Sequence, residues 1–294
     1  MAQWLTKCIR GVMKNQIYLQ VIEDFTRWMV RINYSKGSII SRKRHIKSFL
    51  SFIESRNIKS LEEVTKEVLD DYNSFLHHRP IATKTIEAHI SALKLLNQYR
   101  ELYGKSPVMS KKLRITKTLK IERAIVSKVQ INAMYEACED NPFGWRDRII
   151  LALYYGCGLR YREGAHVEQK DINFNTGLLH IRKGKNYRER HVPMSNGVRT
   201  ELKNWIEYYK PLFSYQTNLI ISSRNGNLIK SAALNRRIRK LLAKTGITKK
   251  ITLHSLRHSI ATHLMDEGMK LEDIGRFLGH VTLETTQKYA HIID

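Results

Sequence analysis

The stretch TLHSLRHSIATHL, residues 252–264, places His254, Arg257 and His258 on one short segment with an apolar background. Residues four apart meet on one face of a helix, so His254 and His258 are expected to be neighbours. A second stretch, LGHVTLETTQKYAHIID at residues 278–294, adds His280 and Tyr289. This concentration of titratable side chains indicates an assembled site rather than a solvated surface.

His280 and Tyr289 can meet only if the chain between them bends. They are nine residues apart, and at about 100° per residue one unbroken helix would point them to opposite sides. Gly279 can end one helix, and Thr282 is a plausible N-cap for the next. A loop followed by a short helix would then return Tyr289 towards His280, although a tyrosine considered alone is more often a packing residue.

A metal site is not indicated by the histidine and cysteine patterns. The His254 and His258 spacing can bind zinc, but the H-E-x-x-H form needs glutamate at position 255, where this chain has Ser255. The three cysteines are far apart and form no C-x-x-C pair, which favours neither a zinc knuckle nor a disulfide framework. We expect no metal, no cofactor and a reducing, cytoplasmic location.

Length and charge indicate two domains and a polyanionic partner. The chain has 294 residues, enough for two cores, and 51 Lys and Arg against 27 Asp and Glu give a net charge of +24. Nucleic acid is the favoured partner, with a solvated or membrane-facing basic surface as the alternative. The longest apolar run, residues 149–159, is about half a membrane span, so no membrane partner is expected.

The first hundred residues show helical periodicity throughout. Apolar residues at 46, 49, 50 and 53 mark one helix, the S-x-x-E pattern at 60–63 suggests that a capping box opens the next, and a further helix is expected at about 82–103. We predict a four-helix domain at residues 1–104. Residues 105–122 are predicted to be a basic linker, either solvated or in contact with a phosphate backbone.

The second half mixes helices with a small amount of strand. Two short β-like runs, residues 178–182 and 190–194, flank a polar turn and predict a hairpin, while helical patterns precede and follow it. The predicted fold class is therefore mainly α. Residues 123–294 are expected to form a mixed α/β, mostly helical domain with a small β-sheet.

Four short islands in this half form a recognisable order. They are GCGLRYRE at 156–163, KGKNYRERHVP at 183–193, HSLRH at 254–258 and LGHVTLETTQKY at 278–289. Each is weak alone: Arg160 could simply pair with Glu163, and Lys185 could simply be solvated. Together they closely resemble the tyrosine recombinases, the family of phage integrases and Xer proteins, over residues 121–289.

The resemblance implies that residues 1–104 are a SAM-like DNA-binding domain and that residues 123–294 are a tyrosine-recombinase catalytic domain. It also implies site-specific DNA recombination through a 3′-phosphotyrosyl intermediate, as in integration, excision, inversion or resolution. Tyr289 would be the nucleophile, and Arg160 and Arg257 would bind the phosphate. His254 would accept the phenol proton, and His280 would hydrogen-bond the phosphate. Lys185 would be the general acid, and Lys183 could compete for that role. Glu163 would orient Arg160, and His258 would be a structural residue.

The implied partners are double-stranded DNA and three further copies of the chain, as a homotetramer on two recombination sites, with no small-molecule substrate. Two alternatives are a catalytically silent DNA-binding accessory protein and a type IB topoisomerase-like enzyme. One departure from the family pattern concerns packing: Gly164 follows Glu163 where an apolar residue is usual, and it should weaken its helix by about 1 kcal/mol.

Overall fold

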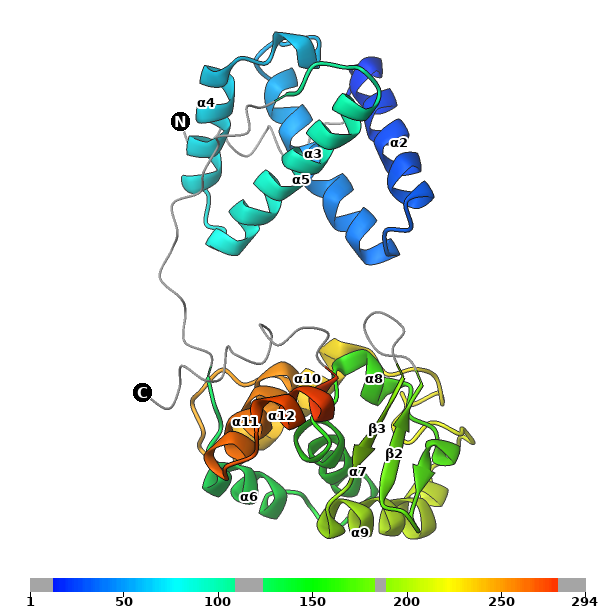
Figure 1. Ribbon diagram of the computed structural model, residues 1–294. Helices are drawn as coiled ribbons and strands as arrows, with labels where there is room; N and C mark the ends of the chain where they lie inside the picture. Colours follow the sequence, from blue (N-terminus) through cyan, green and yellow to red (C-terminus); the bar gives the residue numbers. More distant parts are fainter. Residues whose placement is uncertain (1–12, 109–123, 183–188, 280–294) are drawn as a thin grey trace. The chain divides into compact units, whose positions relative to one another are not determined.

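The computed structural model describes residues 13–108, 124–182 and 189–279. The chain divides into two compact units, Met1–Lys120 and Ile121–Asp294. Each has its own hydrophobic core, and both are mostly helical (Figure 1). Within the described ranges no helix is long and apolar enough to cross a membrane.

The first unit is built from helices around an aromatic-rich core. In the described residues its α-helices are α2 Gln16–Arg31, α3 Lys36–Glu54, α4 Lys66–His77 and α5 Thr83–Leu102. Helix α3 lies against both α2 and α5. The fully buried aromatic side chains that fill the centre include Tyr18, Phe25, Phe49 and Tyr72. The mainly helical first domain expected from the sequence is confirmed.

One local prediction in this unit is wrong. Ser60 does not open an α-helix; it precedes a short 3₁₀ turn, Leu61–Glu63, and makes no capping bond to the backbone. The Glu63 carboxylate instead accepts hydrogen bonds from Ser60 Oγ at 3.1 Å and from the Lys59 N–H at 3.2 Å. Helix α4 then begins three residues later, at Lys66.

The second unit contains a three-stranded antiparallel sheet among helices. Strand β1 Ile172–Asn173 pairs with β2 Leu178–Ile181, which pairs with β3 Arg190–Pro193. The β2–β3 hairpin was expected, whereas the two-residue β1 was not. The helices are α6 Lys128–Glu136, α7 Pro142–Leu151, α8 Tyr161–Ala165, α9 Asn196–Asn204, α10 Ser231–Lys244, α11 Leu253–Asp266 and α12 Leu271–Leu278.

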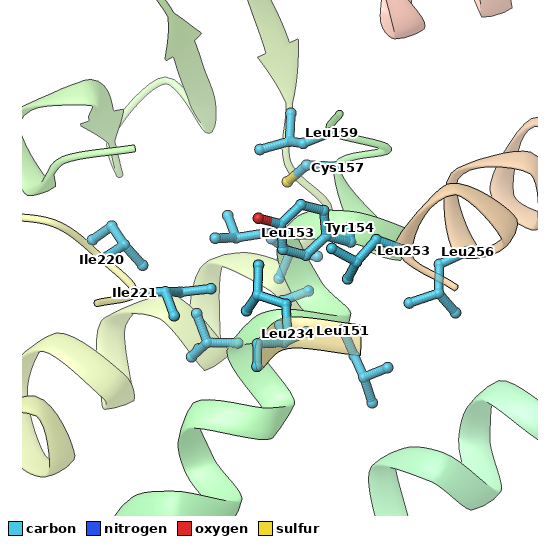
Figure 2. Close-up of a cluster of buried hydrophobic side chains, with 14 of the residues drawn as sticks. Leu151, Leu153, Tyr154, Cys157, Leu159, Ile220, Ile221, Leu234, Leu253 and Leu256 are labelled. Atoms are coloured by element: carbon cyan, nitrogen blue, oxygen red, sulfur yellow. The ribbon is translucent and has the colours of Figure 1, made fainter. Parts of the chain in front are cut away.

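The centre of this core is the segment that follows α7. A π-helical turn, Ala152–Gly156, continues α7 and packs against α11 and α9. Figure 2 shows Leu153, Tyr154 and Cys157 surrounded by apolar side chains from distant segments, including Ile221 and Leu256. This packing holds α11 next to the turn that leads into Arg160, so two of the four sequence islands meet through the core.

Candidate active site

Arg160 is the N-cap of helix α8, and Glu163 in the first turn of that helix binds the arginine in two ways. The Glu163 carboxylate accepts the Arg160 backbone N–H at 2.8 Å, which caps the helix, and Arg160 Nη1 at 2.8 Å. Gly158, two residues earlier, has φ of +58°. A Cβ there would lie 2.9 Å from Leu278 Cδ2. Only glycine therefore fits both the turn and the approach of α12.

Helix α11 supplies the second arginine. Thr252 caps the helix by accepting the Ser255 N–H at 3.3 Å, while Ser255 Oγ accepts the Thr252 N–H at 3.2 Å. One turn later Arg257 is almost wholly buried, with 2% of its surface exposed. It donates from Nη1 to the Gly158 carbonyl and from Nη2 to the Leu278 carbonyl.

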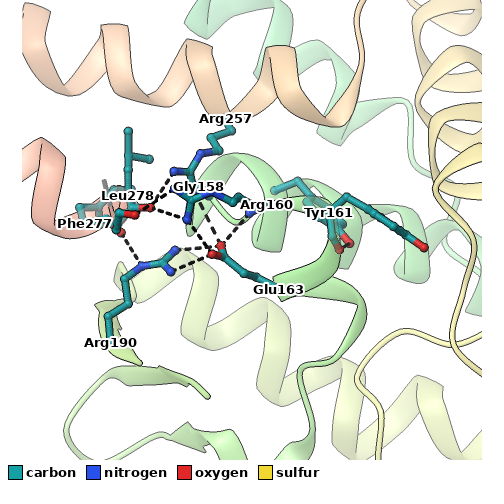
Figure 3. Close-up of polar contacts among 10 residues, drawn as sticks. Gly158, Arg160, Tyr161, Glu163, Arg190, Arg257, Phe277 and Leu278 are labelled. Carbon is teal, nitrogen blue, oxygen red and sulfur yellow. Dashed lines mark hydrogen bonds and ion pairs between the residues drawn. The ribbon is translucent and has the colours of Figure 1, made fainter. Parts of the chain in front are cut away.

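Arg160 and Arg257 converge on the same helix end. Arg160 Nη1 reaches the Leu278 carbonyl at 3.3 Å and its Nη2 reaches the Gly279 carbonyl at 2.9 Å, while Arg257 Nη2 lies 2.6 Å from the Leu278 carbonyl. Figure 3 shows dashed lines from both guanidinium groups to that carbonyl. Two islands 97 positions apart in the sequence thus form one cationic cluster.

Glu163 is the buried counter-ion of the cluster, with 1% of its side chain exposed. Its Oε1 and Oε2 accept Arg190 Nη1 at 3.0 Å and Nη2 at 2.9 Å, and Arg257 Nη1 lies 3.8 Å from Oε2. Burial alone would raise the pKa of this carboxyl. The hydrogen bonds and charge of Arg190, with the bonds from Arg160, outweigh burial and hold the Glu163 pKa at about 2.

His254 lies on the exposed side of α11 and contacts the buried His258. Their Nε2 atoms are 2.9 Å apart, so one nitrogen donates and the other accepts. This contact fixes the orientation of the His254 ring and joins its tautomer to that of His258. The interpretation of His258 as a supporting residue fits this position.

The structure brings together two of the six predicted site residues and places a third on the same helix as one of them. Arg160 and Arg257 share the α12 end, and His254 stands one turn before Arg257 on α11. Lys185, His280 and Tyr289, together with the competitor Lys183, lie outside the described residues. In the described part of the chain, no group of three or more His, Cys, Asp or Glu side chains could hold a metal ion.

Sequence reasoning missed Arg190. It stands in the same KGKNYRERHVP island as Lys185, yet its role becomes visible only through the buried Glu163. A carboxylate with 1% exposure needs partners for both oxygens, and Arg160 alone supplies one guanidinium. Glu163 needs a second arginine that can hydrogen-bond both of its oxygens, and the arginines of the other islands are the candidates. That requirement would have indicated Arg190.

Comparison with known proteins gives the same family as the sequence motifs. The phage integrase family matches residues 125–294, and the phage integrase SAM-like domain matches residues 16–99. The tyrosine recombinase XerD of Staphylococcus saprophyticus is 29% identical over 282 residues, covering 92% of this chain and 94% of the relative. The XerD of Staphylococcus aureus strain N315 is 27% identical over 286 residues, with the same coverage.

Solved structures share the fold. The XerH site-specific recombinase bound to a palindromic difH substrate superimposes with a TM-score of 0.76 at 18% identity, covering 97% of this chain and 95% of that one. The Tn1549 transposon integrase in complex with transposon right end DNA gives 0.73 at 15% identity, covering 92% and 94%. The family match and the XerD relatives define the class as a DNA strand-transfer enzyme of the tyrosine type. The chain belongs to the phage integrase family, and it is a site-specific tyrosine recombinase.

Proposed function

We propose that this enzyme cuts and rejoins double-stranded DNA at specific sites through a 3′-phosphotyrosyl intermediate. The Tyr289 hydroxyl attacks the phosphorus, the bond to the 5′-oxygen breaks, and the strand leaves with a free 5′-hydroxyl. A 5′-hydroxyl from another strand reverses these steps and reseals the DNA. Because one phosphoester is exchanged for another, the reaction needs no external energy source.

The observation that carries this proposal is the convergence of Arg160 and Arg257 beside an ionised Glu163. Negative charge accumulates on the non-bridging oxygens of the reacting phosphate, and preorganised guanidinium groups stabilise it. Each guanidinium has five N–H donors, so Arg160 and Arg257 can keep their carbonyl partners and still bind phosphate oxygens. Loss of one such donor costs about 3 kcal/mol, on the order of a hundredfold in rate.

The proton transfers are assigned to residues around this cluster. A phenol has a pKa near 10, so Tyr289 needs a base as it attacks. The exposed His254 is the proposed acceptor, with its ring held by the contact to His258. Lys185 is proposed to protonate the leaving 5′-oxygen and His280 to hydrogen-bond the phosphate. With two arginines supplying positive charge, no metal is required in this scheme.

The assembly is proposed to be a homotetramer on two DNA sites in the cytoplasm. Residues 1–104 would bind DNA, 105–122 would link the domains and 123–294 would carry the chemistry. The DNA-bound XerH and Tn1549 integrase structures support DNA as the partner. The net charge of +24 is consistent with it.

A suicide substrate tests the proposal. The DNA, taken from sequence flanking the gene, is nicked so that the cleaved strand loses a short fragment and cannot be resealed. Purified protein with EDTA should form a denaturation-resistant DNA adduct, and the Tyr289→Phe variant should form none. If both proteins bind this DNA tightly and neither forms an adduct, the protein acts instead as a silent DNA-binding accessory.

A further inference from the structure

The C-terminal end of α12 is held by three arginines from three different elements. Arg190, at the start of β3, donates from Nε to the Phe277 carbonyl at 3.1 Å. Arg160 and Arg257 donate to the Leu278 carbonyl, and Arg160 also donates to the Gly279 carbonyl. The carbonyls at the end of a helix carry partial negative charge and lack partners within the helix, so these three cations satisfy them.

Arg190 makes two kinds of contact at once. Its two terminal nitrogens form a fork on both oxygens of Glu163, at 3.0 and 2.9 Å, while Nε holds the Phe277 carbonyl. Its side chain is 11% exposed, against 25% for Arg160. Figure 3 shows Arg190 reaching from β3 into the space between Glu163 and the end of α12. No other described residue forks Glu163 in this way.

Gly279 gives a second, independent observation. Its φ is +65°, and a Cβ at this position would lie 2.8 Å from Arg190 Cδ and 2.9 Å from Nε and Nη1. The chain therefore leaves room for the Arg190 side chain at the point where α12 ends. An alanine here would have to displace that guanidinium group.

We propose that Arg190 is a positioning residue for strand cleavage. It keeps Glu163 ionised and oriented, and Glu163 in turn orients Arg160 towards the phosphate, while its Nε bond fixes the end of α12 beside the two phosphate-binding arginines. Arg190 itself has its donors directed at Glu163 and Phe277, so it acts through them. This inference rests on the proposed function.

The test compares Arg190→Lys with the unchanged full-length protein on the suicide substrate. Lysine keeps the positive charge but cannot hydrogen-bond both carboxylate oxygens at once. Cleavage should therefore slow on the order of tenfold or more, as is typical when a residue that orients a functional side chain is lost. The dissociation constant for uncleaved DNA should stay within about twofold. Gly279→Ala should slow cleavage in the same way.

Two further measurements separate positioning from general damage. In a Glu163→Gln background, Arg190→Lys should add little, because both changes break the same connection. On a methylphosphonate substrate, where a neutral methyl replaces one non-bridging oxygen, the rate ratio of unchanged protein to Arg190→Lys should fall towards one. That substrate carries less charge for Arg160 to stabilise.

Arg148 supplies the matched control. It donates from Nε and Nη2 to both oxygens of Glu201 at 2.6 to 3.0 Å and from Nη1 to the Tyr135 carbonyl at 3.1 Å, a comparable set of contacts among α6, α7 and α9. Arg148→Lys should leave cleavage within about twofold. The inference alone is overturned if Arg190→Lys cleaves at the normal rate, or if the rate ratio of unchanged protein to Arg190→Lys is equal on the phosphate and methylphosphonate substrates. If the unchanged protein forms no adduct, the proposed function and the inference are overturned together.

Discussion

Glu163 is the residue that makes a cluster of three arginines possible. Three guanidinium groups within hydrogen-bonding or ion-pair distance of one carboxylate would repel one another if that carboxylate were neutral. Because Glu163 is buried and fully bonded, its charge is compensated inside the protein rather than by water. The carboxylate therefore both stabilises the fold and sets the positive charge that faces the phosphate.

A pH dependence follows from the Glu163 pKa of about 2, lowered from an ordinary 4.5. For a carboxyl whose pKa is lower in the folded state, the unfolded chain binds more protons in acid. The stabilisation is present above about pH 5 and is lost as pH falls towards 2. Its size is roughly 3 kcal/mol. Urea unfolding of unchanged protein and Glu163→Gln across this range should therefore show a stability difference that shrinks in acid.

Glu139 is a useful comparison for that experiment. Its pKa is also lowered to about 2, through hydrogen bonds from Lys244 and Asn141, but its side chain is 49% exposed. Salt screens exposed pairs strongly and buried pairs weakly. The Glu139→Gln difference should disappear in high salt, while the Glu163→Gln difference should persist. A Glu163→Gln difference that stayed constant with pH would contradict the lowered pKa.

Among the elements, α8 shows why a glycine stands where its helix propensity is unfavourable. A Cβ on Gly164 would lie 2.7 to 2.8 Å from Cζ, Cε1 and Oη of Tyr154. Tyr154 is wholly buried, and its hydroxyl donates to the Tyr161 carbonyl at 3.1 Å. The ring therefore has no free space into which it could move. The glycine that seemed to weaken the helix instead allows α8 to pack on the core.

Gly164→Ala is accordingly expected to destabilise the protein. The helix would gain about 1 kcal/mol in propensity, but overpacking a buried site costs about 1 to 3 kcal/mol, so the packing cost should prevail. Gly197 in α9 is the control, because a Cβ there meets nothing within 4 Å. Gly197→Ala should be neutral or stabilising by up to about 1 kcal/mol. Equal effects of the two substitutions in urea unfolding would show that propensity alone decides.

How well an element could be predicted depended on the length of its pattern. The β2–β3 hairpin has alternating residues on both strands, and its register pairs Leu179 with Val192 as two buried neighbours. Strand β1 has two residues, too few for any period, and it exists only because β2 offers an edge. The Ser60 pattern was misread because a capping box and a side-chain bond between Ser60 and Glu63 look identical in sequence.

The residues of the candidate site also differ in how well the sequence predicts them. Arg160, His254 and Arg257 stand in local motifs, and the structure brings these elements together. Arg190 also stands in a local motif, but nothing in that motif shows its role, because its partners Glu163 and Phe277 are 27 and 87 positions away. Contacts of that range come from tertiary packing, and the periodicity of a single segment carries no information about them.

At the scale of the whole molecule, the charges fall into two groups that should respond differently to salt. The net charge of +24 comes from the excess of Lys and Arg side chains along the whole chain. Glu163 and Arg257, by contrast, are a buried pair, with 1% and 2% of their side chains exposed. Phosphate contacts release counterions, so DNA affinity falls linearly with salt on logarithmic axes. Buried pairs are screened much less.

We therefore expect salt to change binding and chemistry separately. Between about 50 and 200 mM salt, the affinity should fall by a factor on the order of a thousand if at least six phosphates are contacted. The rate of adduct formation at saturating protein should change by less than about threefold, because the arginine cluster is assembled by buried hydrogen bonds. Filter binding and the suicide substrate measure the two quantities on one DNA. If the saturated rate instead falls in step with affinity, screened surface charges assemble the site, and the buried cluster around Glu163 is not sufficient to position Arg160 and Arg257.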